Sequence, residues 1–332
     1  MNFERIPLSK EMFVEAKEKR LTLSEVLRAH EKFDREAESK GFSPLVQQLA
    51  ARGLALSGTH AALVDDFFKT EDNKLLFAET INEAVRIGMM EELKSFVNLN
   101  ELVATKTGIG GTIYQGAEVD LDNSAASSRR VGERGEFPSV VIKFKDKAIK
   151  LVKNGYRIEA TYEAIRRIKI NVFAVTMKVL GRNIARDKVA IAADVLINGD
   201  GNSNPIGSIN AAVSGTLAYK DVVNLQEEFE YFEPSLMIAP KAMRVAYLNL
   251  AEYKDKNGPS MPEPPKKCAA VPASKIIALD AKAALEEVFE QGGSMVEYDK
   301  IIAKQIQEAV VSEVSGYAKL FPEASKMLNV TF

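Results

Sequence analysis

The longest hydrophobic pattern in the chain has the period of an α-helix and covers residues 161–198. Its apolar side chains recur three and four positions apart: one stripe is Ile168, Val172, Val175 and Val179, and Phe173, Met177, Leu180, Ile184, Ile191 and Val195 widen it. Gly181 is an interior position of poor helix propensity, which costs about 1 kcal/mol relative to alanine. A continuous helix from Ile170 to Ile197 would be roughly 40 Å long. Its predicted C-cap and turn are Asn198, Gly199, Asp200 and Gly201.

The first 56 residues predict short, highly charged helices. Thr22-Leu23-Ser24-Glu25 has the form of a capping box, and the helix predicted from Glu25 to Lys40 carries few apolar residues. Such a helix is too polar to nucleate a core alone, so it packs on a partner helix, is partly ordered, or forms a solvated extension. Gly41–Pro44 interrupts the pattern, and a further short helix is expected to about Leu54.

More apolar helical sequence follows at 61–68 and 76–90, and a long polar segment then interrupts strand-like sequence between residues 104 and 157. The tip of this segment consists of small and polar residues and contains Arg129, Arg130 and Arg134. Loops of this length are uncommon within a compact domain unless they are functional. The pattern predicts an extended β arm, whose three arginines either keep the tip soluble or contact a neighbouring subunit.

Three local patterns refine the expected arm. Ile142 and Phe144 alternate with Lys143 and Lys145, which is the period-two pattern of a half-exposed strand. Asn154-Gly155 predicts a tight turn between two short strands. Gly108-Ile109-Gly110-Gly111 could cradle a phosphate, but neither Gly-Lys-Ser nor Gly-Lys-Thr follows it, so we interpret it as a flexible hinge between strands.

Residues 208–332 mix helix and strand. The expected elements are a helix at 221–231, a strand at 235–239, a helix from Pro240 to Ala251, an exposed loop rich in proline and lysine at 257–272, and a strand at 275–279. Strand and helix patterns continue through residues 285–332 without an internal repeat.

Composition limits the class of protein. Hydrophobic residues make up 46% of the 332 residues, enough to bury a core. The chain has 44 basic and 46 acidic residues and a net charge of −2, which gives no global support for nucleic-acid binding, although one face could still be basic. The single cysteine, Cys268, fits a reducing compartment. Neither a signal sequence nor an apolar run of membrane-spanning length is present, so we expect a soluble protein made in the cytosol.

A calcium-binding loop is suggested by Asp200-Gly201-Asn202-Ser203-Asn204. Such a loop needs glycine at its sixth position and glutamate at its twelfth, where this chain has Pro205 and Ala211. We interpret the segment as a turn.

Catalytic and metal-binding patterns are otherwise missing from the sequence. His30 and His60 both lie in the N-terminal third, far from Cys268, and predict neither a metal cluster nor a Ser-His-Asp triad. Glu227-Glu228 is better explained as a solvated helix face than as a catalytic carboxylate pair. We expect no catalytic residue, no metal and no cofactor, which points away from enzymes.

The order of these elements resembles the tailed-bacteriophage major capsid protein family of the Hong Kong ninety-seven type. The resemblance covers about residues 75–332 and rests first on the long helix that runs into Leu196-Ile197-Asn198-Gly199-Asp200-Gly201. An Asn-Pro-Ile-Gly stretch at 204–207, a strand followed by a helix from Met237-Ile238-Ala239-Pro240, and the closing Leu320-Phe321-Pro322-Glu323-Ala324 support it.

The resemblance implies an α+β fold with named parts. These are an N-terminal helical arm at 1–75, a peripheral (P) domain at 76–103, 151–207 and 281–332 that contains the long spine helix, an extended β loop (E-loop) at 104–150, and an axial (A) domain at 208–280. It implies inter-subunit contacts for Arg129, Arg130 and Arg134 at the E-loop tip. It also implies an axial loop that contains Met261, Lys266 and Lys267, near the capsomer axes.

The function implied by the resemblance is that of a coat protein which assembles through hexamers and pentamers into an icosahedral head around double-stranded DNA. Expected partners are other copies of the chain, portal, scaffold or decoration proteins, and packaged DNA bound without sequence specificity. The expected location is the virion capsid, after synthesis in the cytoplasm of the host bacterium. Two alternatives remain open: an encapsulin-type compartment shell and a cytosolic α/β enzyme.

Overall fold

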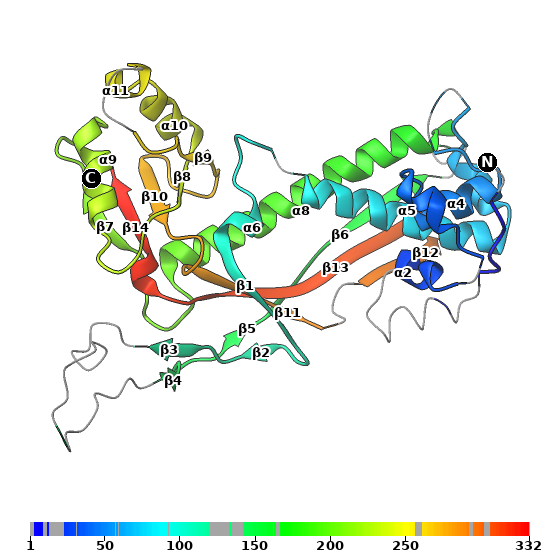
Figure 1. Ribbon diagram of the computed structural model, residues 1–332, viewed down its shortest axis with the longest axis horizontal. Coiled ribbons are helices and arrows are strands. Elements are labelled where there is room, and N and C mark those ends of the chain that lie inside the picture. Colours follow the sequence, from blue (N-terminus) through cyan, green and yellow to red (C-terminus); the bar gives the residue numbers. More distant parts are fainter. Residues whose placement is uncertain are drawn as a thin grey trace. The chain divides into compact units, whose positions relative to one another are not determined.

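The chain divides into two compact units, and Figure 1 labels their helices and strands where there is room. The first comprises Met1–Glu91, Asn154–Ile184 and Gly292–Glu313, and the second comprises Glu92–Lys153, Ala185–Gln291 and Val314–Phe332. The computed structural model describes residues 3–8, 12, 23–30, 32–56, 58, 60–91, 93–119, 133, 142–161, 163, 167–255, 261–291, 295–301 and 306–331.

Helices dominate the first unit. They are α2 (Leu23–Arg28), α3 (Arg35–Ser39), α4 (Pro44–Ala51), the 3₁₀ helix η1 (Val64–Phe68), α5 (Glu71–Met90) and the first half of α8 (Ile170–Asn198). Leu27, Leu49, Phe67 and Ile170 belong to one buried cluster, so residues from the N-terminal segment share a core with α5 and α8. The N-terminal helices therefore have the partner helices that their polar sequence requires, and the solvated-extension interpretation is wrong.

The helix predicted from Glu25 to Lys40 is two short helices. α2 ends at Arg28, and Asp34 begins α3 by accepting a hydrogen bond from the backbone N–H of Ala37 at 3.0 Å. A side chain that caps a new helix start favours a break at that point. The predicted capping-box residue Thr22 lies outside the described residues. The next predicted helix is α4, which Ser43 caps.

The long predicted helix is confirmed as α8, but its apolar stripe is divided between core and surface. Ile170 and Met177 are buried, whereas Val172, Val175 and Val179 are 59%, 61% and 46% exposed. None of the described helices combines the length and the apolar composition that a membrane span requires.

Two glycines let α5 and α8 touch through their backbones. A Cβ atom on Gly88 would overlap the carbonyl oxygen of Lys178 and lie 2.8 Å from its Cα atom. A Cβ atom on Gly181 would overlap the carbonyl oxygen of Val85 and lie 3.0 Å from the backbone nitrogen of Met89. Gly181, which only weakens the helix in isolation, is therefore needed for the packing of the two helices.

Two strands pair with β13 (Ile306–Lys319) in the first unit. β12 (Met295–Ile301) runs antiparallel to it, from Met295 opposite Ser312 to Ile301 opposite Ile306, and β6 (Val152–Thr161) also pairs with it. The turn predicted at Asn154-Gly155 is wrong, because both residues lie inside β6. Pairing with a strand 150 residues later in the sequence overrides the local turn signal.

The second unit contains a small sheet in the order β1 (Val103–Ile109), β11 (Leu285–Glu290) and the C-terminal end of β13. β1 is parallel to β11, and β11 is antiparallel to β13 with Leu285 opposite Lys319. Gly108 lies in β1 opposite Phe289, so the predicted glycine hinge begins within a paired strand.

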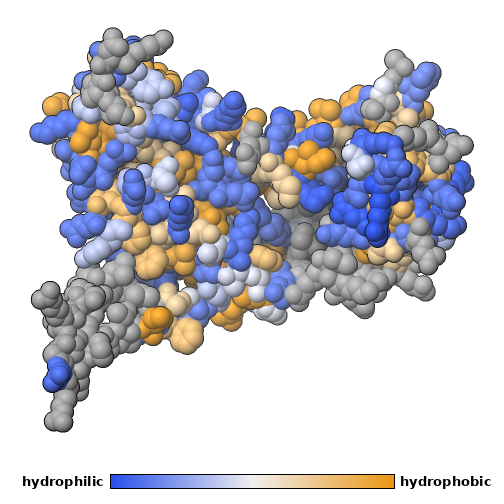
Figure 2. Space-filling view, in the orientation of Figure 1, coloured by the Kyte–Doolittle hydropathy of each residue, from blue (hydrophilic) through white to orange (hydrophobic). Residues whose placement is uncertain are grey.

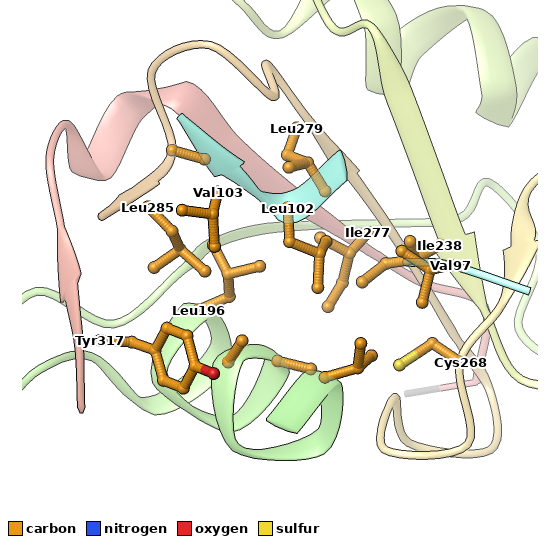
Figure 3. Close-up of a cluster of buried hydrophobic side chains, with 14 of the residues drawn as sticks. Val97, Leu102, Val103, Leu196, Ile238, Cys268, Ile277, Leu279, Leu285 and Tyr317 are labelled. Atoms are coloured by element: carbon orange, nitrogen blue, oxygen red, sulfur yellow. The ribbon is translucent and has the colours of Figure 1, made fainter. Parts of the chain in front are cut away.

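A five-stranded mixed sheet completes the second unit. Its order is β7 (Gly207–Asn210), β14 (Ser325–Asn329), β10 (Lys275–Leu279), β8 (Leu236–Ala239) and β9 (Lys266–Lys267), accompanied by α9 (Tyr219–Glu227), α10 (Lys241–Leu248) and α11 (Ala251–Lys254). Ile277 and Leu279 of β10 face one apolar cluster with Leu196 of α8 (Figure 3), whereas Ile276 and Ala278 face the other. Successive side chains of a strand point to opposite faces of the sheet, so β10 contributes side chains to both cores.

The described part of the predicted loop at 257–272, residues 261–272, is not the exposed loop that its prolines and lysines predict. Lys266 and Lys267 form β9 beside β8, and Pro265, Cys268 and Val271 are buried. Backbone pairing with β8 and burial of these three side chains explain the difference. The helix from Pro240 also ends earlier than predicted, at Leu248, with Pro240 as its N-cap.

A buried lysine closes the last turn of α8. Nζ of Lys319 donates to the carbonyl oxygens of Leu196 at 3.1 Å and Asn204 at 3.0 Å. The last four carbonyls of a helix lack partners within it, and positive charge is favourable at that end. Burial lowers the pKa of Lys319 to about 8, although the charges of Asp200 and Glu323 oppose this shift.

The backbone contact at Gly88 and Gly181 predicts that Gly→Ala substitutions destabilise these helices, which is opposite to their usual effect on stability. Alanine normally stabilises a helix interior by about 1 kcal/mol relative to glycine. We expect Gly88→Ala and Gly181→Ala instead to lower the free energy of unfolding by about 1–3 kcal/mol, because the new methyl group meets backbone atoms. Urea unfolding followed by circular dichroism measures this change. Gly110→Ala, where no atom lies within 4 Å, is the matched control, and stabilisation by Gly181→Ala would refute the contact.

Lys319 predicts a pH-dependent stability. Its lowered pKa means that the folded protein loses this proton near pH 8, while the unfolded chain keeps it to about pH 10.4. The unfolded state then binds more protons, so the contribution of Lys319 to stability rises across that window, by about 3 kcal/mol at most. We expect the unfolding free energy of the native chain to increase relative to Lys319→Met between pH 7 and pH 10. A difference that stays constant with pH would contradict this assignment.

Candidate functional site

The turn after α8 forms as predicted and is fixed by backbone geometry. Gly199, Gly201 and Ser203 have φ angles of 88°, 94° and 59°, and the N–H of Gly199 donates to the carbonyl of Val195 at 2.9 Å. A Cβ atom on Gly199 would lie 2.6 Å from Oδ1 of Asn204, so this position needs glycine for space as well as for φ.

Asp200 places a buried carboxylate at the centre of the turn. Its Oδ2 accepts a hydrogen bond from Nζ of Lys145 at 2.8 Å and another from the backbone N–H of Lys319 at 3.1 Å. Its Oδ1 accepts one from the N–H of Asn202 at 3.2 Å. Burial alone would raise the pKa of Asp200, but the hydrogen bonds from Lys145 and Asn202 outweigh it and lower that pKa. The carboxylate is therefore ionised, and both of its oxygens accept hydrogen bonds from the protein.

These contacts agree with the interpretation of the segment as a turn instead of a calcium loop. The oxygens of Asp200 are occupied by protein donors. Across the part of the chain that the structure describes, no group of three or more His, Cys, Asp or Glu side chains could hold a metal ion.

The turn also holds the base of the β arm. The amide group of Asn202 accepts from the N–H of Lys147 at 2.8 Å and donates to its carbonyl at 3.2 Å. Lys145 donates through Nζ to the carbonyl of Lys319 as well as to Asp200. One turn thus fixes the arm to β13 and to the end of α8. The hydrogen bonds of Lys145 are buried or part-buried and those between Asn202 and Lys147 are exposed, and a buried network rigidifies the structure when every partner is satisfied.

The arm is a two-part hairpin. β2 (Ile113–Tyr114) pairs with β5 (Ile149–Lys150), and β3 (Ala117–Val119) pairs with β4 (Ile142–Phe144), all antiparallel. Tyr114 donates its hydroxyl to the buried carboxylate of Glu286 at 2.8 Å, and burial together with this carboxylate raises the pKa of Tyr114 to about 12. Leu151 packs against Gly316, which has no room for a side chain.

The arm exposes three large apolar side chains. Ile113, Ile142 and Phe144 are 70%, 69% and 74% exposed, and Lys143 between the last two is exposed as well. The prediction of a half-exposed strand is therefore wrong for β4, which is exposed along its whole length, whereas Lys145 directly after it is buried against partners 55 and 174 residues away in sequence. Figure 2 shows hydrophobic atoms on this part of the surface.

The remaining predicted site residues fall into three groups. Arg129, Arg130 and Arg134 lie outside the described residues. Asn198, Gly199, Asp200 and Gly201 form the turn described above. The third group, Met261, Lys266 and Lys267, lies elsewhere in the second unit: Met261 packs on an apolar core, Lys266 pairs with Glu101, and Nζ of Lys267 is 5.1 Å from the ring centroid of Phe96.

Sequence reasoning missed Lys145, Lys319 and Glu286 as site residues. Glu286 and Lys319 lie in strands and Lys145 directly follows β4, and charged residues are almost never fully buried unless they are paired. Their partners are distant in sequence, so no local spacing identifies them. Glu227 and Glu228 do lie on an exposed helix end, as predicted, with Glu228 3.9 Å from Lys326.

Comparison with known proteins adds to this geometry. Residues 145–291 match the protein family described as phage capsid protein, while no curated protein matches the sequence. The matched residues include Lys145, Asp200 and the whole of α8.

Solved capsid structures share the fold at low sequence identity. The capsid protein of a native GTA particle superposes with a TM-score of 0.53 and 14% identity over 73% of this chain and 94% of that chain. The capsid protein of an empty GTA particle gives 0.50 and 15%, over 73% and 99%. A phage-related protein from Bordetella bronchiseptica RB50 gives 0.51 and 10%, over 75% and 96%.

The similarity of fold to these structures confirms the predicted α+β fold. The chain therefore carries a phage capsid protein domain at residues 145–291 and has the Hong Kong ninety-seven type fold of the capsid structures that it matches.

Proposed function

We propose that this protein assembles with copies of itself, through hexamers and pentamers, into the icosahedral head that encloses the double-stranded DNA of a tailed phage. The phage capsid protein domain at residues 145–291 is the observation that carries this proposal. Contacts between unlike surfaces that close by rotation form rings, and many modest contacts then stabilise a shell. The location that follows is the virion capsid, after synthesis in the host bacterial cytoplasm.

The arm supports a contact between copies. Three large apolar side chains on it, Ile113, Ile142 and Phe144, are more than half exposed in the single chain. Contiguous exposed apolar surface marks an interaction site more often than scattered single residues do. Because the base of the arm is bonded to the α8 turn, the apolar face is held ready for a partner, which reduces the entropy lost on association.

The named parts of the fold complete the proposal. Residues 104–150 act as the E-loop, 208–280 as the A domain, and 76–103, 151–207 and 281–332 as the P domain, with residues 1–75 as the N-terminal arm. Arg129, Arg130 and Arg134 contact a neighbouring subunit. Within the proposed axial loop, Lys266 and Lys267 are poor contact residues because they lie in β9. Portal, scaffold or decoration proteins and packaged DNA are the further proposed partners.

An encapsulin-type shell is the second candidate. The long E-loop and the N-terminal helices favour the phage head, and the contents of the particle separate the two functions. A cytosolic enzyme is disfavoured, because residues 145–291 match the phage capsid protein family.

Negative-stain electron microscopy with light scattering on the purified chain tests the proposal. We expect closed shells, tubes or capsomer rings. Nucleic acid within particles recovered from the host supports the phage head, and protein cargo supports an encapsulin. A uniform monomer that persists at high concentration and with crowding agents would overturn the shell function.

The apolar arm face predicts an assembly defect without a folding defect. We expect Ile142→Ser combined with Phe144→Ser to reduce shell yield at least about tenfold, since a loss of 1.4 kcal/mol per contact already has that effect. The thermal unfolding of the subunit should change little, because both side chains are about 70% exposed. Lys143→Ser on the same strand is the matched control. Normal shells from the double variant would show that this face is not an assembly contact.

A further inference from the structure

Two cations meet at one aromatic ring in the second unit. Cζ of Arg186, on α8, lies 5.1 Å from the ring centroid of Phe96, and Nζ of Lys267, in β9, lies 5.1 Å from the same centroid. An aromatic face attracts a cation within about 6 Å, so the ring holds both charged groups. The two positive charges are therefore within about 10 Å of each other.

The backbone that carries this cluster is fixed. The N–H of Lys267 donates to the carbonyl of Ser95 at 2.9 Å, and the N–H of Val97 donates to the carbonyl of Lys267 at 3.3 Å. Val97 shares a buried apolar cluster with Val189, which lies three residues beyond Arg186 on α8. The aromatic ring is 37% exposed and Arg186 is exposed, so the two cations are presented at the surface from a rigid base.

Among the described residues, no carboxylate forms an ion pair with Arg186 or Lys267. Asp187 follows Arg186 but lies about 100° further around α8. Other lysines of the same unit are each at ion-pair distance from a carboxylate: Lys106, Lys145, Lys188, Lys266 and Lys326. A cation–π contact orients a charged group without using its N–H donors, so both cations keep their donors for an anion.

We propose that Arg186 and Lys267, held on the ring of Phe96, bind backbone phosphates of double-stranded DNA, which rests on the proposed packaging function. Charges on one DNA strand follow each other every 3.4 Å or so along the axis, so two cations within about 10 Å can bind neighbouring phosphates. Phosphate contacts carry no sequence information, which matches packaging of any sequence. This local pair supplies the basic face that the net charge of −2 leaves open, and it differs from the axial contact predicted for Lys267.

Binding of a short DNA duplex to the unassembled full-length chain tests the site. Fluorescence anisotropy of the labelled duplex gives the association constant at salt concentrations between about 50 and 200 mM. Each phosphate contact contributes about 0.9 to the slope of log K against log salt, so Arg186→Gln combined with Lys267→Gln should make this slope shallower by about 1.8. The matched control, Lys220→Gln combined with Lys241→Gln, removes the same charge from exposed positions of the same unit.

A third variant separates the ring from the charges. Phe96→Leu keeps both cations but removes the aromatic face, so we expect weaker binding at every salt concentration with an unchanged slope. An unchanged slope in the Arg186→Gln, Lys267→Gln chain, or an equal change in the control, overturns the site, as does poly-glutamate that competes as well as DNA of equal charge. Thermal unfolding checks that each variant folds. Electron microscopy of the same variants reads shell assembly separately, so either result can fail without the other.

Discussion

A carboxylate without contact to water needs hydrogen-bond donors, and Asp200 obtains them from two distant parts of the chain and from its own turn. Lys145 comes from the arm, Lys319 from the last strand of the small sheet, and Asn202 from the same turn. Removal of one partner would leave a buried charge unpaired, which typically destabilises a protein by about 3–5 kcal/mol. The direction of the arm, the end of α8 and the end of β13 therefore depend on one another.

The sequence predicted those parts of the fold in which local periodicity decides the structure. The spacing of apolar residues along the sequence predicts α8, β8 and β10, and no distant contact changes these elements. The turn at Asn198–Gly201 is predicted by its glycines, which adopt positive φ angles. The element order and its resemblance to a capsid family supplied the fold. Asn154-Gly155 failed because a strand pairing, invisible in a short window, outweighs a turn dipeptide.

The candidate site was less predictable, because its charged residues are paired with residues far away in sequence. Lys145 sits where alternation suggests a solvent-facing lysine, and Lys319 is a lysine at the end of a strand. Nothing within ten residues of either one indicates a buried partner. Gly181 is a second example of a residue whose role depends on a distant contact. Helix propensity predicts that it destabilises α8, but does not predict that the backbone of α5 lies too close for any larger residue. Glycines and lysines in unfavourable places therefore deserve inspection for distant partners.

The contact between α5 and α8 at Gly88 and Gly181 has a mechanical consequence for the proposed shell. Most helix pairs are separated by side chains, which can change rotamer when the helices are pressed together. α5 and the first half of α8 instead meet through main-chain atoms at Gly88 and Gly181, and the covalent backbone has no alternative arrangement that shortens the distance. In the proposed shell, packed DNA would press outward on the wall. At Gly88 and Gly181 the contact between α5 and α8 would then resist compression through rigid main-chain atoms, not through side chains that can change rotamer.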